Sequence, residues 1–518
     1  VKEVSIRGVR SNGMLASEKE LDISNNHEQV FLLDEDAPVG EIFSVFYGLD
    51  DYILDIENKA LTNRPDCFGL IGLVRDISGI NKIRFKTPDW YNYGYKESWE
   101  FVNNKIESDT HLKIDISLEE KKDVLRYSAV AMDGIKVSES PIRLKIFLAK
   151  HGMRPVNNVV DISNYLMLIT GQPLHVFDLD KVIQGDRNST DDKCSIVVRK
   201  ARAGETLLMI NGKIAELDED IVVIADSMSP LAVAGVMGGK DTEVTEDTKR
   251  IIIESATFDL YNIRKTQMKV GVFSEAATRF MRGQDSEQTL PVLDRAITLY
   301  SQIAGGKRAS DIIDKRNKDR EKYEVSFDIT DANRIIGKDF KKEEIQKILD
   351  YIELKSEING SKITVQIPSY RKDLRIPEDI YEDISRLYGF GEIPLKLPNR
   401  KVAPVKQNRI MNLEFKIREI FESFGGNDLI TYNFIGRKLV EKSNLDIEKL
   451  YKIKNPLSPE LEYMRNSLLP NILDKVKMNV DYGYSQMFLY EINKFHIKDS
   501  LNKERLPNEF RCVAGVYV

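Results

Sequence analysis

The sequence predicts a multidomain chain of the α+β class, and three observations lead to this prediction. At 518 residues, the chain is long enough for three or four domains of roughly 150 residues each. Segments with the alternating pattern of strands and segments with helical spacing follow one another irregularly. No repeat of about 20 to 50 residues, which would indicate a solenoid or a propeller, recurs along the chain.

The composition excludes several classes of protein. The chain has 76 Lys and Arg against 82 Asp and Glu, a net charge of −6, so any contact with RNA must be local. Its three cysteines lie far apart, and neither a disulfide framework nor a cysteine zinc site is expected. With 31% charged residues and a mean hydropathy of −0.34, the sequence predicts no membrane span, and its first residues carry no signal-peptide pattern. It therefore predicts a cytoplasmic protein.

The two ends of the sequence predict a piece of a longer protein. The chain begins at Val1 without a methionine, and residues 512–518 form a β-type run that stops without a turn or a tail.

Domain boundaries are expected where charge, proline and glycine cluster, most clearly at residues 305–322 and 394–408. The unit between them is expected to contain strands at 325–329 and 362–367 and helices at 331–336, at 342–352 and at its end. Beyond it, apolar residues between 413 and 424 recur at helical spacing until Gly425 and Gly426 end the helix.

The densest group of carboxylates lies in residues 368–389, PSYRKDLRIPEDIYEDISRLYG. Pro377 fits the first position of a helix, and Gly389 fits its C-terminal cap. Three acids share a face of this helix and a fourth lies just upstream: Asp379, Glu382, Asp383 and Asp373. Such a group indicates a Mg²⁺ site. The alternative is that acids favour the N-terminus of a helix because of its dipole.

Polar residues interrupt the apolar pattern of residues 156–180, VNNVVDISNYLMLITGQPLHVFDLD. Within this run His175 is a candidate to donate to an ester or to orient water, and Asn164 to bind a sugar hydroxyl. The alternative is that His175 makes a structural hydrogen bond. The five histidines of the chain never recur at metal-ligand spacing, so a zinc site is not expected.

Two later segments also indicate a site. Residues 231–244 place small residues, including Ala234 and Gly235, where backbone can approach a ligand, although the run lacks both GxGxxG and a Walker lysine. Glu254 follows an apolar run and would need a bonding partner if it faced inward. The alternatives are a tight turn for the first segment and a surface acid at a strand end for Glu254.

In this order along the chain, the segments closely resemble the bacterial phenylalanyl-tRNA synthetase β subunit. The resemblance covers nearly the whole chain, and the order of the motifs makes coincidence remote although each alone is weak. The motifs are RGVRSNGMLASEKEL (7–21), TNRPDCFGLIGLVRDI (62–77), GMRPVNNVVDISNYLMLITGQPLHVFD (152–178), AGVMGG (234–239), IESA (253–256), SEAATRFMRGQD (274–285), IPSYRKDLRIPEDIYEDISRLYGF (367–390) and NPLSPELEYMRNSLLPNIL (455–473).

The resemblance implies five parts, and it implies that most of the family's OB domain and its C-terminal anticodon-binding domain are missing. The parts are the end of a tRNA-binding OB domain (1–35), a helical linking segment (36–105), a mixed α/β editing domain (118–308), a small winged or DNA-binding-like α+β domain linked to a metal (323–397) and a truncated, catalytically inactive class II synthetase-like domain with an antiparallel sheet (408–518).

The resemblance also implies a division of work. A catalytic α subunit would bind ATP and charge tRNA(Phe), while this β subunit would bind tRNA and hydrolyse misacylated Tyr-tRNA(Phe), in an (αβ)₂ heterotetramer. A second site is useful because a pocket that binds an aromatic ring discriminates only weakly against an analogue that carries one additional hydroxyl.

The family's motifs assign roles to residues of this chain. No nucleophilic triad is evident, so hydrolysis by a positioned water is expected, with Glu254 as the tyrosine sensor. Arg465 resembles the ATP-clamping arginine of class II synthetases and is expected to be structural here. The implied editing residues are Asn164, His175, Ala234, Gly235, Glu254, Ser274 and Ala276, and the implied Mg²⁺ ligands are Asp373, Asp379, Glu382 and Asp383.

Three departures from the family's pattern leave an alternative open. Ser274 stands where the family usually has threonine, Glu275 where it has aspartate, and Asp383 where it has glutamate. The alternative is a noncatalytic tRNA-docking and scaffold subunit whose editing site has decayed. A hydrolase without a synthetase partner is disfavoured by the synthetase-like domain.

Overall fold

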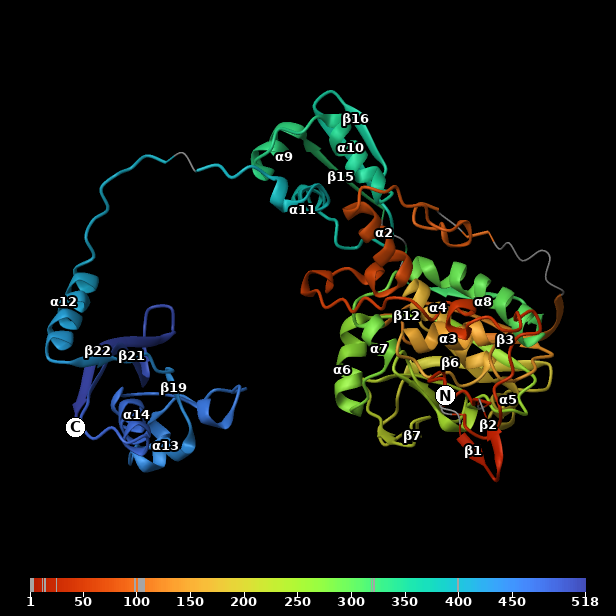
Figure 1. Cartoon of the computed structure of the whole chain (residues 1–518), viewed down its shortest axis with the longest axis horizontal. Helices are drawn as coiled ribbons and strands as arrows, with labels where there is room; N and C mark the ends of the chain where they lie inside the picture. The colour runs from red at the N-terminus through yellow and green to blue at the C-terminus, as the bar shows by residue number, and fades with distance from the viewer. Residues whose placement is uncertain are drawn as a thin grey trace. The chain divides into compact units, whose positions relative to one another are not determined.

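The chain has a mixed α and β fold of several domains, as predicted, and it divides into two compact units, Val1–Lys396 and Leu397–Val518 (Figure 1). The computed structural model describes residues 4–11, 13, 15–24, 26–96, 99–100, 108–317, 319, 322–397 and 400–518. The predicted boundary at residue 105 and part of the predicted OB segment lie outside the described residues.

The first unit begins with a hairpin and a series of short helices. The hairpin strands, β1 (Val4–Ile6) and β2 (Val9–Ser11), turn at Arg7 and Gly8. A Cβ on Gly69, which precedes α2, would lie 2.3 Å from the carbonyl carbon of Thr170, so only glycine fits this position. The helices are α1 (Phe43–Phe46), η1 (Lys59–Leu61), η2 (Pro65–Phe68), α2 (Leu70–Ile80) and η3 (Asp89–Tyr91).

Ten strands of the described residues form one sheet in the order β11-β10-β9-β6-β3-β13-β4-β12-β5, with β14 also paired to β4. The sheet extends beyond the predicted limits of 118 and 308 on both sides. The strands are β3 (Ser108–Leu118), β4 (Val124–Asp133), β5 (Leu174–Asp178), β6 (Lys193–Lys200), β9 (Val222–Ala225), β10 (Pro230–Val233), β11 (Met237–Gly238), β12 (Ile251–Phe258), β13 (Lys307–Ser310) and β14 (Ile313–Arg316).

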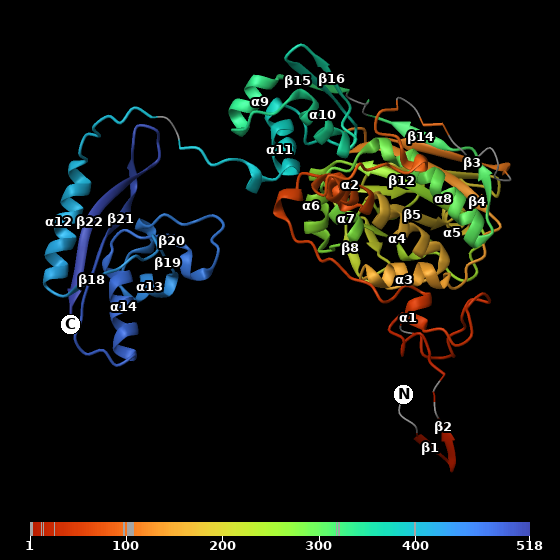
Figure 2. The same ribbon diagram turned by 45° about the horizontal axis from the view of Figure 1, so that its top comes forward.

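Both faces of this sheet are buried. Along β12, Ile251 and Ile253 pack with α4 and α8 in one core, whereas Ile252 and Ala256 pack with β6, β9 and β10 in the other. Figure 2 shows α4 beside β5. The helices are α3 (Ile142–Lys150), α4 (Asn158–Thr170), α5 (Leu179–Gly185), α6 (Leu260–Val270), α7 (Glu275–Phe280) and α8 (Thr289–Ala304), beside a small hairpin of β7 (Thr206–Leu208) and β8 (Ile214–Glu216).

The sheet curls until its two end strands meet. A Cβ on Gly238 of β11 would lie 2.4 Å from Cε1 of His175 on β5. Two strands at opposite ends of the strand order therefore close around one core.

A smaller α+β segment follows in the same unit, with three antiparallel strands in the order β15-β17-β16. The predicted strands and helices are confirmed here within two residues, and α11 starts at Pro377 and is capped by Gly389 as predicted. The strand β16 was not predicted. The elements are β15 (Tyr323–Asp328), α9 (Ile329–Ile336), α10 (Lys342–Tyr351), β16 (Ser356–Asn359), β17 (Lys362–Ile367) and α11 (Pro377–Tyr388).

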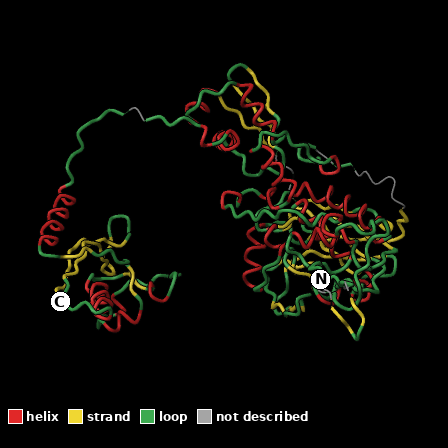
Figure 3. Tube along the Cα trace, in the orientation of Figure 1, coloured by secondary structure: helices red, strands yellow, loops and turns green. Residues whose placement is uncertain are grey.

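The second unit has a three-stranded sheet, β18-β21-β22, covered by helices (Figure 3). The predicted antiparallel sheet is in fact mixed, because β18 pairs parallel with β21. The long stretch of chain between these two strands allows the crossover that parallel pairing needs. The elements are α12 (Arg409–Ser423), β18 (Gly426–Asp428), β19 (Phe434–Ile435), α13 (Arg437–Lys442), β20 (Tyr463–Met464), α14 (Leu469–Asp481), β21 (Phe488–Leu501) and β22 (Pro507–Tyr517).

In the part of the chain that the structure describes, no helix combines the length and the apolar character needed to cross a membrane.

Candidate functional site

Glu254 and His175 face each other across two neighbouring strands. They stand directly opposite in the antiparallel pair of β12 and β5, so their side chains leave the sheet on the same face. Phe177 lies on that face too, with its ring centroid 4.4 Å from that of His175. Strand register thus brings two of the predicted site residues together.

Glu254 is a buried acid with one hydrogen bond among the described residues. It is 5% exposed, and its Oε2 accepts a hydrogen bond of 2.9 Å from the hydroxyl of Tyr127. Burial raises the pKa of Glu254 to about 8, although the hydrogen bond from Tyr127 lowers it. At neutral pH the carboxyl is therefore largely protonated and can donate as well as accept.

His175 is a neutral ring at the same place. Burial lowers the pKa of His175 to about 4, so at neutral pH one ring nitrogen donates and the other accepts. Such a ring suits the orientation of a water molecule.

The loop from Ala234 to Gly238 runs over this face of the sheet. Gly235 has a φ of +67°, and a Cβ there would lie 2.9 Å from Cδ2 of Phe258. Gly238, at the other end of the loop, lies against His175. The loop thus spans from Phe258 to His175, on the face where Glu254 also lies.

Ser274 fastens α7 to this loop. Its Oγ donates to the carbonyl oxygen of Val236 at 2.7 Å and accepts from the backbone N of Ala277 at 3.1 Å. Ala276 packs against the same core. Six of the predicted site residues therefore share one region, and four of them are only half-buried, so the region reaches the surface: His175, Gly235, Ser274 and Ala276.

Asn164 is not joined to this group. It lies half-buried on α4, whose apolar residues Val159 and Leu166 pack in the core on the opposite face of the sheet. Among the described residues, no hydrogen bond joins Asn164 to His175 or Glu254. Its part in the site stays a prediction.

Tyr127 is a site residue that the sequence did not single out. It stands in the middle of the apolar run of β4, where a buried phenol needs a hydrogen-bond acceptor. That need is the signal that could have found it, since a buried Glu254 needs a donor for the same reason.

The structure brings two of the four predicted Mg²⁺ ligands, Asp373 and Asp383, to one arginine, and the Mg²⁺ site stays a prediction. Arg371 bonds both oxygens of Asp373 and, at 2.6 Å, Oδ2 of Asp383. Asp379 accepts from the backbone N of Ile376 at the start of α11, and Glu382 is exposed. No group of three or more His, Cys, Asp or Glu among the described residues is placed to hold a metal ion.

Asp373 and Asp383 belong to a buried ion cluster that links α2 to α11. Arg386 bonds Asp383 at 2.8 Å and Asp76 at 2.6 Å, and Arg64 bonds Asp76 at 3.2 Å. Burial alone would raise the pKa of Asp383, but the arginines, Arg371 foremost, lower it to about 2. Since the arginines occupy the oxygens that a cation would need, the residues present do not fit Mg²⁺ in this chain by itself.

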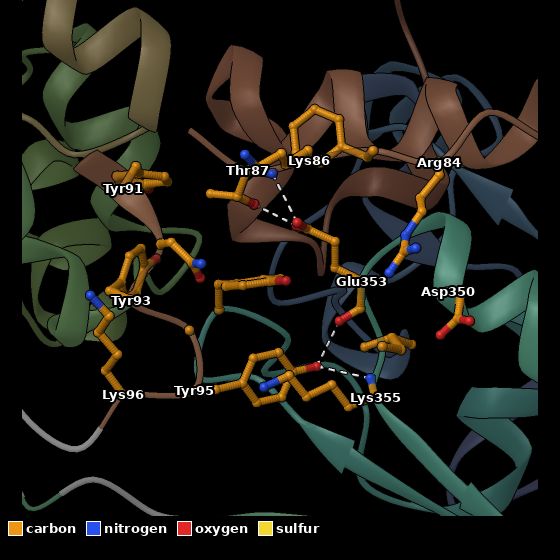
Figure 4. Close-up of a pocket in the computed structure, with 15 residues that line it drawn as sticks. Arg84, Lys86, Thr87, Tyr91, Tyr93, Tyr95, Lys96, Asp350, Glu353 and Lys355 are labelled. Carbon is orange, nitrogen blue, oxygen red and sulfur yellow. Dashed lines mark hydrogen bonds between the residues drawn. The ribbon is translucent and has the colours of Figure 1, made fainter. Parts of the chain in front are cut away.

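A cavity of about 710 Å³ lies where residues 84–96 meet residues 350–355 (Figure 4). Tyr95 donates from its hydroxyl to the carbonyl oxygen of Glu353 at 2.7 Å, and the Glu353 carboxylate accepts from the backbone N of Thr87 at 2.8 Å. These bonds join two segments far apart in sequence. None of the predicted site residues lines this cavity.

Arg465, in the second unit, has every donor engaged within the protein. Its guanidinium bonds both oxygens of Glu491, at 3.1 and 3.2 Å, and neither side chain is exposed. The remaining bonds go to Thr431, Asn433 and the carbonyl of Lys494. Because an arginine has five N–H donors, none is left here for a phosphate.

Three domain families match the chain in order. The B3/4 domain matches residues 123–305, the tRNA synthetase B5 domain matches residues 325–390, and the phenylalanyl tRNA synthetase beta chain CLM domain matches residues 393–518.

Curated relatives match nearly all of the chain. The chain is 35% identical to the phenylalanine–tRNA ligase beta subunit of Fusobacterium nucleatum over 497 residues, which are 95% of this chain and 59% of that protein. It is also 35% identical to the beta subunit of Moorella thermoacetica, over 100% of this chain and 62% of that protein. The chain thus spans about three fifths of the length of these relatives.

Among solved structures, an N-terminal fragment of the phenylalanyl-tRNA synthetase beta subunit from Pyrococcus horikoshii has 18% sequence identity and a TM-score of 0.33. That match covers 63% of this chain and 84% of the fragment.

Proposed function

Because the chain belongs to the family of phenylalanine–tRNA ligase beta subunits, we propose that it is the β subunit of that ligase and hydrolyses misacylated Tyr-tRNA(Phe). In this proposal an α subunit binds ATP and activates phenylalanine, and the two subunits act on tRNA(Phe) in the cytoplasm as an (αβ)₂ heterotetramer. The guanidinium donors of Arg465 all bond groups of this chain, which supports the proposal that ATP binds to the α subunit.

The observation that carries the proposal is the pairing of Glu254 with His175 beneath the loop of small residues. Glu254 Oε2 is held by Tyr127, and among the described residues no hydrogen bond reaches Oε1. A phenolic hydroxyl that enters the site can bind this oxygen. A plain phenyl ring leaves a buried oxygen without a partner, and such a loss costs about 1–3 kcal/mol.

The ester would be cut by water. The water oxygen forms a bond with the carbonyl carbon of the tyrosyl ester, the bond from that carbon to the ribose oxygen breaks, and the proton of the water passes to the ribose oxygen. The products are tyrosine and tRNA with a free terminal hydroxyl.

The residues of this chain position these groups. His175, neutral at pH 7, orients the water, and the backbone near Ala234 and Gly235 holds the phenolic hydroxyl together with Glu254. Ser274 and Ala276 hold the loop in place. Asn164 is assigned to the tRNA terminus from the family's motif alone.

An apolar helix face supports a partner for the second unit. α12 buries none of its residues, and Ile410, Leu413 and Ile420, which share one side of the helix, are 57, 58 and 52% exposed. A contiguous apolar face of this kind marks a protein interface, and the α subunit is the partner that we propose for it.

Deacylation of Tyr-tRNA(Phe) by the αβ complex tests the proposal. Glu254→Ala should lower the rate at least tenfold because the hydroxyl loses its hydrogen-bond partner. The matched control is Glu219→Ala, since Glu219 is exposed, and it should change nothing. An unchanged rate in Glu254→Ala would remove the assigned role.

The alternative of a decayed site is tested by the same assay. The two hydrogen bonds of Ser274 use only its hydroxyl, which threonine also has, so the absent methyl does not undo the link to Val236. A wild-type complex that charges tRNA(Phe) but never deacylates Tyr-tRNA(Phe) would be a scaffold subunit. Failure to copurify with α would instead indicate a separate hydrolase.

A further inference from the structure

We propose that Tyr127 is a positioning residue that sets the hydroxyl specificity of the ester-hydrolysing site by holding Glu254 Oε2, so that Oε1 alone is offered to the substrate. This inference rests on the proposed function and adds to it the residue that orients the sensor.

The geometry of the two strands brings the pair together. Tyr127 on β4 stands opposite Ala256 on β12, and Glu254 lies two positions before Ala256. Tyr127 and Glu254 are therefore diagonal neighbours on one face of the sheet, a separation that a tyrosine side chain can bridge. The hydroxyl of Tyr127 lies 2.9 Å from Oε2.

The bond is enforced by burial. Tyr127 is 0% and Glu254 5% exposed, and among the described residues each side chain makes this hydrogen bond and no other. No Lys, Arg or His of the described residues forms an ion pair with Glu254. Breaking the bond would leave two buried polar groups without partners, so the arrangement is fixed before any substrate arrives.

A fixed carboxyl has a consequence for selection. A carboxyl whose two oxygens have no hydrogen-bond partner can rotate. It can then bind a substrate hydroxyl or a water molecule in several orientations. With Oε2 held by Tyr127, one oxygen in one orientation remains, and a substrate hydroxyl must meet it there. Tyr127 thus acts on the substrate through Glu254.

Few titratable groups share this environment. His175 is paired with Glu254 from β5, and Cys194 on β6 lies close enough to Tyr127 to act on its ionisation. The pKa of Glu254 itself responds to burial first and to Tyr127 second. Because donation from Tyr127 favours the ionised carboxyl, loss of the donor should raise the pKa of Glu254 further.

The test compares two tyrosines in the αβ complex. Tyr127→Phe removes the bond to Glu254, while Tyr300→Phe removes an equally buried hydroxyl that bonds Val159 and Ser163 on the other face of the sheet. The readout is the ratio of kcat/KM for Tyr-tRNA(Phe) over Phe-tRNA(Phe), measured across pH.

We expect Tyr127→Phe to lower this ratio about tenfold, the effect of one hydrogen bond, and to move the pH midpoint of the tyrosine-specific rate upward. Tyr300→Phe should leave both unchanged. In a chain that already carries Glu254→Ala, adding Tyr127→Phe should have no further effect on the ratio. An unchanged ratio and midpoint in Tyr127→Phe would overturn the assignment.

A second measurement keeps the hydroxyl in place in case Tyr127→Phe does not fold. Incorporation of 3-fluorotyrosine at position 127 alone makes the hydroxyl a stronger acid and a stronger donor, so the pH midpoint should move downward. An unmoved midpoint contradicts the proposal. If the wild-type complex deacylates Tyr-tRNA(Phe) no faster than Glu254→Ala does, the proposed function itself fails, a result distinct from an unchanged ratio in Tyr127→Phe.

Discussion

Glu254 and His175 are paired across β12 and β5, yet burial moves their pKa values in opposite directions, to about 8 and to about 4. Both shifts favour the neutral side chain. The site therefore holds two uncharged groups at neutral pH. The free energy of unfolding of the protein should then depend on pH in a way that can be measured.

Glu254→Gln should remove one part of the pH dependence of stability. The folded pKa of Glu254 lies above its unfolded value of about 4.5, so its contribution is fully present below about pH 4.5 and is lost as pH rises through about 8. A glutamine cannot ionise. The variant should therefore lose less stability than the wild type between about pH 4.5 and about pH 8, as measured by thermal unfolding of the first unit. A difference between the two proteins that does not vary with pH would contradict the assigned pKa.

Gly238→Ala should impair deacylation. A Cβ at this position would lie 2.4 Å from Cε1 of His175, so the ring or the loop must move. A shift of about 1 Å in a positioning group costs about a hundredfold in rate, and the deacylation of Tyr-tRNA(Phe) by the αβ complex is the measurement. Gly391→Ala is the matched control, since nothing lies within 4 Å of a Cβ there. An activity equal to that of the control would show that His175 needs no fixed position.

Arg465→Lys should destabilise the second unit. A lysine keeps the charge but loses the two-bond geometry with Glu491 and leaves buried acceptors without donors. Disrupting a buried pair costs about 3–5 kcal/mol, which thermal unfolding of the full chain would detect as a lower transition temperature. The control is Arg409→Lys on the exposed surface of α12. Equal transition temperatures in the two variants would mean that the ion pair contributes nothing.

Crystals of this chain soaked in Mn²⁺ should show no anomalous peak beside Asp373 or Asp383. The arginines Arg371 and Arg386 already bond the oxygens of both carboxylates. Arg371→Met should leave the repulsion between Asp373 and Asp383 uncompensated and lower the free energy of unfolding by about 3–5 kcal/mol. Added Mn²⁺ should then make this variant more stable. Arg334→Met, at an exposed ion pair, serves as the control. A peak in the wild-type crystals would instead support the metal site that the sequence predicts.

Features that depend on neighbouring residues could be read from the sequence. Pro377 and Gly389 mark the ends of α11. The preference for proline in the first turn of a helix and for glycine just after its last turn depends only on neighbouring residues. The strand at 362–367 was predicted with its correct limits, since its alternation is local.

Features that depend on pairing between distant segments could not be read in this way. The register that sets Glu254 opposite His175, and Tyr127 within reach of Glu254, arises only when β4, β12 and β5 align. The acids of α11 resembled a metal site because most of their arginine partners lie outside the helix. Local charge spacing cannot tell a cation from a guanidinium.

The ion cluster between α2 and α11 has a consequence for folding during translation. Asp76 and Arg386 are 310 positions apart. A ribosome adds roughly 5–20 residues per second, so about 15–60 seconds pass between the two. An unpaired charge resists leaving water, and the segment around Asp76 must stay hydrated on the growing chain until α11 has emerged. The segment around Asp76 is translated before the strands of the large sheet, yet it is among the last segments to pack against that sheet.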